Sequence, residues 1–221
     1  RGALICLDDA GKGAKDFHCV YHAWRYDLRG NLKSIAFQRG VNGKGGMDAG
    51  FRMDDHSPRK IRIGTICGLV FGTMSDDTPD LETWLGPEVL PKFQRVVAGR
   101  NIEIIGRYVQ VLPSNWKMYA ENVRDSYHAS LLHLFFATFK INRLSQGGGL
   151  TVSENGGCSA SSTIAPTQTN DQAYAGIRSV DDEFGLEDTS LLDVVDEHPD
   201  RIRQHIVTVF PNFAMQKTQN A

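Results

Sequence analysis

The stretch WKMYAENVRDSYHASLLH, residues 116–133, restricts what this chain can fold into more than any other. Its apolar members suit a buried helix: Trp116, Met118, Tyr119, Leu131 and Leu132. Its polar members do not: Glu121, Asn122, Asp125, His128 and His133. Each polar group taken out of water costs a few kcal/mol of free energy unless it finds a partner. The stretch therefore requires something that satisfies acids, an amide and imidazoles together.

The spacing of the polar residues within this stretch indicates a metal site. Asp125 and His128 are three residues apart, so they share one face of a helix. A carboxylate beside a histidine is the usual arrangement behind a metal ligand, because it fixes the imidazole tautomer. His133 follows His128 by five residues, which places the two rings roughly 140° apart on an undistorted helix. We therefore predict that the helix bends or unwinds near residues 129–132.

Two histidines and a carboxylate form the ligand set of mononuclear non-heme iron(II) oxygenases, which leaves positions open for O₂ and substrate. The third ligand need not be Asp125. The H-E-x-x-H pattern of zinc proteases does not occur in the sequence, which argues against that class. The alternative without a metal is a pair of solvated histidines on a helix.

A second group of residues, CVYH, pairs Cys19 with His22. A thiolate and an imidazole three residues apart on a tight loop can bind one metal centre, either zinc or an iron–sulfur cluster. Without a metal they would be ordinary strand residues. Trp24 and Tyr26 follow directly, and large rings of this kind keep water away from a cluster.

Composition excludes several other classes. The chain has 221 residues, a net charge of -2 and 23% charged residues, with no basic cluster that would indicate nucleic-acid binding. No apolar run reaches the roughly 18 residues of a membrane span. The four cysteines are too scattered for a disulfide framework. Because the sequence lacks an initiator methionine and stops within a strand-like pattern, we expect an internal fragment of a longer protein.

The order of patterns along the chain predicts an α+β protein with three parts. Residues 1–75 are rich in short strand-like segments, including 2–7, 17–27, 31–37 and 59–74. Residues 76–100 combine prolines and acids with helical apolar spacing, which is typical of a linker with one or two short helices. Residues 101–221 begin with a predicted strand at 101–113. After the 116–133 stretch we expect loops with some strand at 145–190 and a strand pair at 203–219.

Two motifs resemble a known family. FHCVYHAWRYDLRGNL, residues 17–32, resembles the second half of the Rieske [2Fe–2S] motif, C-x-H followed by C-x-x-H. The first pair is not in this sequence, although the chain begins with the Arg1-Gly2 that typically follows it. NWKMYAENVRDSYHASLLH, residues 115–133, resembles the catalytic signature of Rieske non-heme iron oxygenase large (alpha) subunits.

The resemblance implies a β-rich Rieske domain at 1–75, a linker with short helices at 76–100, and a helix-grip catalytic domain at 101–221, with antiparallel sheet and helices, both domains truncated. Carried over by position, Cys19 and His22 would bind the [2Fe–2S] cluster, with Trp24 beside it. His18, next to Cys19 on the opposite strand face, is a poor ligand candidate.

The second motif implies that His128 and His133 bind mononuclear Fe(II). Asp125 would bridge His128 to a cluster histidine, by position His22, of the neighbouring subunit. Asn122 would sit close to the iron without being a firm ligand. The family's third ligand is an aspartate far downstream, so no residue here is given that role.

FKINRLSQGGG, residues 139–149, and GVNGKGGM, residues 40–47, are similar to the branch that acts on aromatic carboxylates such as terephthalate, anthranilate, salicylate and halobenzoate. We therefore expect ring hydroxylation with O₂ and electrons from NAD(P)H, delivered by a reductase directly or through a ferredoxin. We also expect an α3 or α3β3 oligomer in the bacterial cytoplasm, and no nucleic-acid or membrane partner. Arg143 and Arg178 could meet a substrate carboxylate, but we favour solvated or ion-paired arginines.

Three alternatives remain open at this point. The first is ring hydroxylation of an aromatic compound without a carboxylate. The second is a Rieske electron carrier, which would leave residues 101–221 without a role. The third is a helix-grip binding protein, which would leave Asp125, His128 and His133 unsatisfied.

Overall fold

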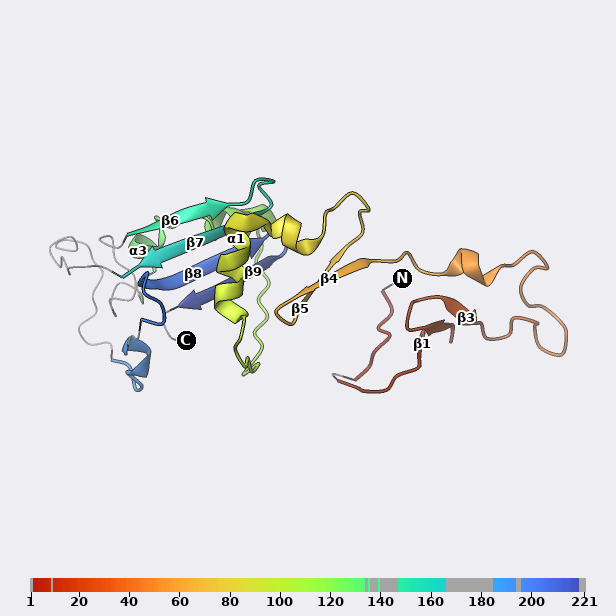
Figure 1. Ribbon diagram of the computed structural model, residues 1–221. Helices are drawn as coiled ribbons and strands as arrows, with labels where there is room; N and C mark the ends of the chain where they lie inside the picture. The colour runs from red at the N-terminus through yellow and green to blue at the C-terminus, as the bar shows by residue number, and fades with distance from the viewer. Residues whose placement is uncertain are drawn as a thin grey trace. The chain divides into compact units, whose positions relative to one another are not determined.

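The computed structural model describes residues 2–8, 10–133, 135, 139, 147–165, 185–193 and 196–218. The chain divides into two compact units (Figure 1). The first comprises residues 1–63 and 72–76, and the second comprises residues 64–71 and 77–221. None of the helices in the described part of the chain is long and apolar enough to cross a membrane.

The first unit contains a three-stranded antiparallel sheet formed by β1 (Asp16–His18), β2 (Arg25–Asp27) and β3 (Leu32–Ser34), followed by a 3-10 turn at Met53–His56. The carboxylate of Asp27 accepts hydrogen bonds from the backbone N–H groups of Asn31 and Arg29, which fixes the turn between β2 and β3. Short strands thus form in the segments predicted at 17–27 and 31–37, with residues 19–24 as a loop, but the strand expected at residues 2–7 is not formed.

Residues 59–74 fold into the predicted pair of strands, β4 (Arg62–Ile66) and β5 (Leu69–Thr73), which form a two-stranded sheet. The turn between them contains only Cys67 and Gly68, with φ of 49° and 82°. Two consecutive positive φ angles match the right-handed twist of a tight hairpin, and glycine adopts the second without strain. Residues 64–71, at the end of this hairpin, belong to the second unit.

Helix α1 (Leu81–Val97) corresponds to the short helices predicted at 76–100. Asp80 caps it, because its side chain accepts a hydrogen bond from the backbone N–H of Thr83 at 2.9 Å. The helix is interrupted at Gly86, whose φ is 72°, and Pro87 begins the second segment, where a missing N–H is tolerated. Leu85, Val89, Phe93 and Val97 recur every four residues and form one buried stripe.

The second unit is built on a four-stranded antiparallel sheet with the order β6-β7-β8-β9. Its strands are β6 (Gly147–Val152), β7 (Cys158–Ile164), β8 (Ile202–Val209) and β9 (Phe213–Thr218). The strand pair predicted at 203–219 is confirmed. The turn between β8 and β9 contains a cis peptide bond at Phe210–Pro211.

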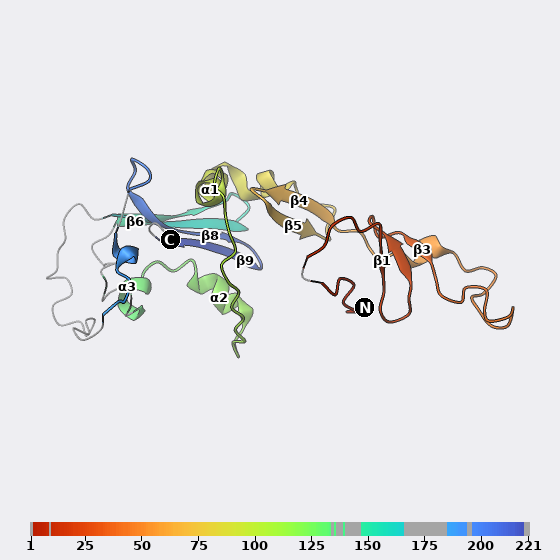
Figure 2. The ribbon, with the colours of Figure 1, turned by 90° about the horizontal axis from the view of Figure 1, so that it is seen from below.

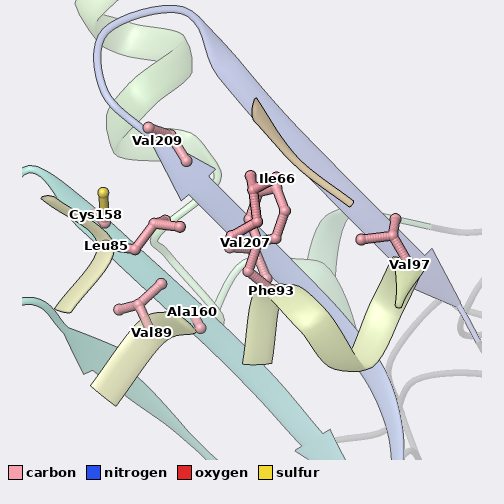
Figure 3. Close-up of a cluster of buried hydrophobic side chains, with 9 residues drawn as sticks. All are labelled: Ile66, Leu85, Val89, Phe93, Val97, Cys158, Ala160, Val207 and Val209. Atoms are coloured by element: carbon pink, nitrogen blue, oxygen red, sulfur yellow. The ribbon is translucent and has the colours of Figure 1, made fainter. Parts of the chain in front are cut away.

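The two faces of this sheet meet different helices. The α1 stripe packs against Cys158, Ala160, Val207 and Val209, which alternate along β7 and β8 and form the hydrophobic core (Figure 3). Helices α2 (Trp116–Asn122) and α3 (Ala129–Leu132) lie on the opposite side of the sheet from α1 (Figure 2). The functional residues predicted in this unit are therefore on the side away from the core.

Two further fold predictions were wrong. Residues 101–113 form no strand, and Ile104, Ile105 and Val111 are each at least 88% exposed. A strand needs backbone partners as well as β-branched residues, and no backbone pairing to this segment occurs among the described residues. The second error concerns burial in the 116–133 stretch. Its helices are only seven and four residues long, and Trp116, Tyr119 and Leu132 are more than half exposed.

Candidate functional site: a histidine pair beside the sheet and a cysteine loop

The helical stretch at 116–133 is interrupted, but not where the sequence predicted. Helix α2 begins after Asn115, whose side chain accepts a hydrogen bond from the backbone N–H of Lys117. It ends at Asn122, and α3 begins at Ala129 with His128 as its N-cap residue. The break therefore falls at residues 123–128, while residues 129–132 form a helical turn. Because His128 precedes this turn and His133 follows it, their relative position is not that of one continuous helix.

The two imidazoles converge. The Nε2 atoms of His128 and His133 are 3.2 Å apart, and the ring centroids are separated by 5.1 Å. The side-chain amide of Asn122 lies 3.2 Å from the same Nε2 atom of His128. The structure thus brings together three of the residues singled out in the sequence, with the two Nε2 atoms 3.2 Å from each other.

The separation of the two nitrogens fits a shared metal ion. Metal–imidazole bonds of about 2.1 Å span a nitrogen–nitrogen distance of 3.2 Å at an angle of about 100°, which adjacent ligands of one ion adopt. Imidazole is a suitable ligand for iron. No three His, Cys, Asp or Glu side chains come together in this way among the described residues, so the two imidazoles are at most two of the three ligands that a facial triad needs.

Asp125 lies on the other side of the His128 ring. Its Oδ2 atom is 3.2 Å from Nδ1 of His128, and its Oδ1 atom accepts a hydrogen bond from the backbone N–H of Tyr127 at 2.8 Å. The Tyr127 bond is the main reason why the pKa of Asp125 is lowered, and His128 lowers it further. The buried Nδ1 atom has no well-aligned hydrogen bond, so the Asp125 contact is close in distance but not ideally oriented. A carboxylate at Nδ1 favours the tautomer that leaves Nε2 free to bind a metal.

A cavity of about 200 Å³ opens beside the histidine pair. Its helical side contains Asn122, Asp125, His128 and His133. Its other side is the sheet, which contributes Ser161, Thr163, Gln204, Ile206 and Gln216. These sheet residues alternate with those of the hydrophobic core, so they project from the opposite face.

A second, larger cavity of about 550 Å³ lies along the same face, near the β8–β9 turn. Trp116 and Phe210 line it with their ring centroids 5.4 Å apart, and Arg124 contributes a cation. Tyr119 and Val123 line both cavities and therefore separate them. The sequence indicated that Trp116 belongs to a buried helix, but it is 53% exposed and lines this cavity instead.

Cys19 and His22 lie on the loop between β1 and β2. The backbone N–H of Cys19 donates to the carbonyl of Trp24 and that of Ala23 donates to the carbonyl of Cys19, both at 2.8 Å, so the loop is tight. The pKa of the Cys19 thiol is lowered, chiefly by a hydrogen bond from the backbone N–H of Tyr21 and next by that of His22. Amide donors around a thiolate sulfur are typical of iron–sulfur sites. In contrast, burial raises the pKa of Cys158, on the core face of the sheet, to about 11.

The aromatic residues near this loop form a small cluster. Trp24 meets Phe51 and His56 edge-on, with centroid distances of 6.4 and 6.1 Å, and the latter two rings stack at 4.3 Å. His22 is exposed and contacts the ring of Tyr21 at 3.9 Å. His18 instead faces Asp16, with Nε2 3.5 Å from its carboxylate, and its side chain is 64% exposed.

The comparison with protein families identifies the chain. Residues 96–220 match the family described as "Ring hydroxylating alpha subunit (catalytic domain)". This match covers more than half of the sequence and includes the whole 116–133 stretch. The chain therefore belongs to the family of ring-hydroxylating oxygenase alpha subunits.

Individual relatives agree with this assignment. The chain is 48% identical to the terephthalate 1,2-dioxygenase terminal oxygenase component subunit alpha 2 of Comamonas sp., over 100% of this chain and 54% of that protein. It is 41% identical to the anthranilate 1,2-dioxygenase large subunit of Burkholderia cepacia, over 100% of this chain and 52% of that protein. The chain thus spans about half the length of the curated relatives it matches.

The fold agrees as well. The structure superposes on naphthalene 1,2-dioxygenase from Rhodococcus sp. with a TM-score of 0.63 and 20% identity, covering 98% of this chain and 49% of that one. At this level of identity the comparison concerns the fold alone, and it identifies the sheet-dominated architecture of Rieske oxygenases.

The sequence did not reveal the polar side of the 200 Å³ cavity. The sequence nevertheless contained a signal for this polar side. Ser159, Ser161 and Thr163 alternate with core residues along β7, and Gln204 and Ile206 alternate with core residues along β8. Asp196, Glu197 and Asp200 are exposed, and they pair with Arg203, Arg100 and Arg95. Arg143 and Arg178 lie outside the described residues.

Proposed function

We propose that this chain is part of the alpha subunit of a multicomponent oxygenase that hydroxylates the ring of an aromatic carboxylate. The observation that carries the proposal is the approach of the Nε2 atoms of His128 and His133 to 3.2 Å beside a cavity. Neither an electron carrier nor a simple binding protein has a use for two imidazole nitrogens held this close together beside a cavity.

The substrate class rests on two arguments. Relatives that align with the whole chain are named for terephthalate and anthranilate, and both compounds are single rings that carry carboxylates. The cavity beside the histidines has a volume of about 200 Å³. This is below the roughly 300–1,000 Å³ of pockets for drug-sized ligands, so it suits one ring better than two fused rings.

His128 and His133 would hold the mononuclear iron through Nε2, and Cys19 and His22 would hold part of the [2Fe–2S] cluster. When bound, the cluster supplies electrons that a reductase takes from NAD(P)H, and the iron supplies O₂ activation. Asn122 would remain near the iron, since its amide faces Nε2 of His128. The loop amides of Tyr21 and His22 would stabilise the Cys19 thiolate, and Trp24 would shield the cluster from water.

Asp125 would link the two centres between subunits. Its carboxylate lies at Nδ1 of His128, yet half of its side chain is exposed, which leaves room for a second partner. We propose that this partner is the imidazole of His22 from an adjacent subunit, so that one acid accepts a hydrogen bond from each histidine. A contact between different surfaces of identical chains forms a ring when its rotation closes, and we propose that this ring is a trimer of alpha subunits.

The test uses the full-length oxygenase. We expect about three irons per alpha subunit, two in the cluster and one at the histidine pair. His128→Ala and His133→Ala should each remove the mononuclear iron and abolish ring hydroxylation of terephthalate or anthranilate, while the visible absorbance of the cluster remains. Iron analysis and absorption spectra measure both outcomes.

His18→Ala is the matched control, because this exposed histidine lies beside Cys19 without facing the loop. Both its iron content and its cluster spectrum should equal those of the wild type. If both variants of the histidine pair retain all their iron, the ligand assignment is wrong. If the wild type carries cluster iron alone, the protein is an electron carrier.

The link through Asp125 has a separate test. Asp125→Asn should lower product formation per O₂ consumed and slow turnover roughly 10–100-fold with both metal centres retained, since Asn replaces one of the two acceptor oxygens by a donor NH₂ group and so cannot accept from a histidine on each side. Asp188→Asn is the control, because Asp188 makes the same turn contact with a backbone N–H two residues on, at 2.9 Å. Wild-type turnover in the Asp125 variant would refute the link.

A further inference from the structure

The sheet side of the 200 Å³ cavity is polar, and this pattern calls for an explanation. Ser161 and Thr163 on β7, Gln204 on β8 and Gln216 on β9 all line it. The register places Thr163 opposite Gln204 and Ile206 opposite Gln216, so these side chains are neighbours on one face. We call these four polar residues the cavity floor. Ile206 is the apolar residue among them.

Burial makes the polarity costly. Ser161 is 6% exposed and Gln204 is 7% exposed. A sheet face covered by helices is normally apolar, as the α1 side of this sheet is, and buried polar groups must find hydrogen-bond partners. The hydroxyls and amides of the floor can form further hydrogen bonds with the contents of the cavity, which suits a polar ligand better than a purely hydrocarbon one.

The charges around the cavity narrow the choice of ligand. No lysine or arginine is among the described residues that line it. The acid there, Asp125, is on the helical side with the histidines, and it repels another carboxylate. A carboxylate in this cavity is best placed against the floor, where each amide offers two N–H donors and each hydroxyl offers one. The side-chain N–H of Gln216 donates to Oγ1 of Thr218 at 3.1 Å, which leaves its second N–H for a ligand.

We propose that the cavity floor binds the carboxylate of the aromatic substrate, with Gln216 and Gln204 as the principal donors, and thereby directs the ring at His128 and His133. This inference rests on the proposed function, since it assumes an aromatic carboxylate as substrate. It assigns to four residues of the sheet a role in choosing and orienting that substrate, while the histidine pair holds the metal.

The experiment compares charged and neutral ligands on full-length oxygenase. Terephthalate and anthranilate are titrated into the anaerobic enzyme by calorimetry, alongside their primary carboxamides, and KM and kcat are measured for each. Gln216→Leu removes the donors at similar size and should raise Kd and KM for the carboxylates roughly 10-fold, with a smaller change in kcat. Gln216→Glu adds a negative charge and should raise Kd for the carboxylates roughly 100-fold, but far less for the carboxamides.

Gln110→Leu is the matched control, because Gln110 lines the larger cavity and not the smaller one. Its affinities should equal those of the wild type. Gln204→Leu tests the buried amide, and its iron content and circular dichroism report whether the fold survives. Since Gln216 is exposed, its variants remain informative if Gln204→Leu fails to fold.

The outcomes separate this inference from the proposed function. If the wild type oxidises a carboxylate and both Gln216 variants keep its Kd and its preference over the carboxamide, the floor does not bind the carboxylate. If the wild type contains all three irons but neither binds nor oxidises terephthalate or anthranilate, the substrate class is wrong, and the inference falls with it. Loss of carboxylate preference in both Gln216 variants supports the inference.

Discussion

The two faces of the four-stranded sheet have opposite characters although they share the same strands. The face toward α1 presents Cys158, Ala160, Val207 and Val209, and all are at most 5% exposed. The face toward α2 and α3 presents mainly serine, threonine and glutamine around the histidine pair. The period of two along a strand allows one segment to serve a core and a binding site at the same time.

This difference shows where stability and chemistry are located. The α1 face removes apolar surface from water and stabilises the fold. Polar groups on the other face contribute little to stability, because a typical hydrogen bond yields only about 1 kcal/mol net. The hydroxyl groups of Ser159 and Thr208 are hydrogen-bonded to each other at 2.6 Å, so this part of the face has a structural role. Further along the strands, around the smaller cavity, it is available to a ligand.

The largest effect should come from emptying the apolar face. Phe93 is fully buried and contacts the rings of Phe71 and Phe213, at centroid distances of 6.3 and 6.1 Å. Phe93→Ala should lower the free energy of unfolding by roughly 3–5 kcal/mol, through lost burial and the cavity left behind. Gln216→Leu on the opposite face should change it by no more than about 0.5 kcal/mol. Urea unfolding of both variants measures the contrast, and equal losses would break the distinction between the faces.

An intermediate effect should follow from lowering the pH, through His205, which lies on the α1 side of the sheet. His205 is 2% exposed, and its Nδ1 atom is 3.2 Å from the hydroxyl of Ser162. Burial, and then the positive charges of Arg95 and Lys92, lower its pKa to about 4.

Between the unfolded pKa of about 6.5 and the folded value of about 4, the unfolded chain binds a proton that the folded chain does not. Stability should therefore be complete above about pH 6.5 and fall by about 3 kcal/mol as the pH drops to about 4. Urea unfolding across this range measures the loss. His205→Gln should flatten the dependence, and an unchanged slope in this variant would assign the effect to other groups. Glu197 and Asp200 have pKa values of about 2, so they lose their contribution at lower pH.

The smallest effect should come from the ion pairs at the end of α1. Arg95 binds both carboxylate oxygens of Asp200, and its side chain is 17% exposed. Arg95→Ala should cost about 1 kcal/mol of unfolding free energy, since a bidentate, partly buried pair exceeds an ordinary surface pair. Arg52→Ala, which removes an exposed pair with Asp55 at 3.9 Å, should cost almost nothing. Similar losses in thermal or urea unfolding would show that burial of the pair is irrelevant.

The sequence predicted local features well where side chains alone decide them. The strands within 59–74 and the strand pair at 203–219 follow from alternation and turn residues. The convergence of His128 and His133 was anticipated because a five-residue spacing cannot serve one metal on a regular helix. The position of the break was wrong, since the break falls at residues 123–128 rather than 129–132.

Features that depend on distant partners could not be predicted. Residues 101–113 have the composition of a strand, yet pairing is a property of two segments, and composition describes only one. The cavity floor brings together β7, β8 and β9, which are separated by up to dozens of residues in the chain. Which of their residues become neighbours depends on the register of the strands. Glu197 likewise meets Arg100 and Lys217 only after folding.

The boundary between the two units is not a single position in the chain, because the β4–β5 hairpin contributes residues to both units. The end of the hairpin, residues 64–71, supplies Ile66, Leu69 and Phe71 to the hydrophobic core beneath α1, while residues 72–76 return to the first unit. A protease or an engineer cutting the chain after the last residue of β5 would deprive the catalytic half of part of its own interior. Separate expression of the two halves therefore calls for a duplicated hairpin, with one copy retained in each piece.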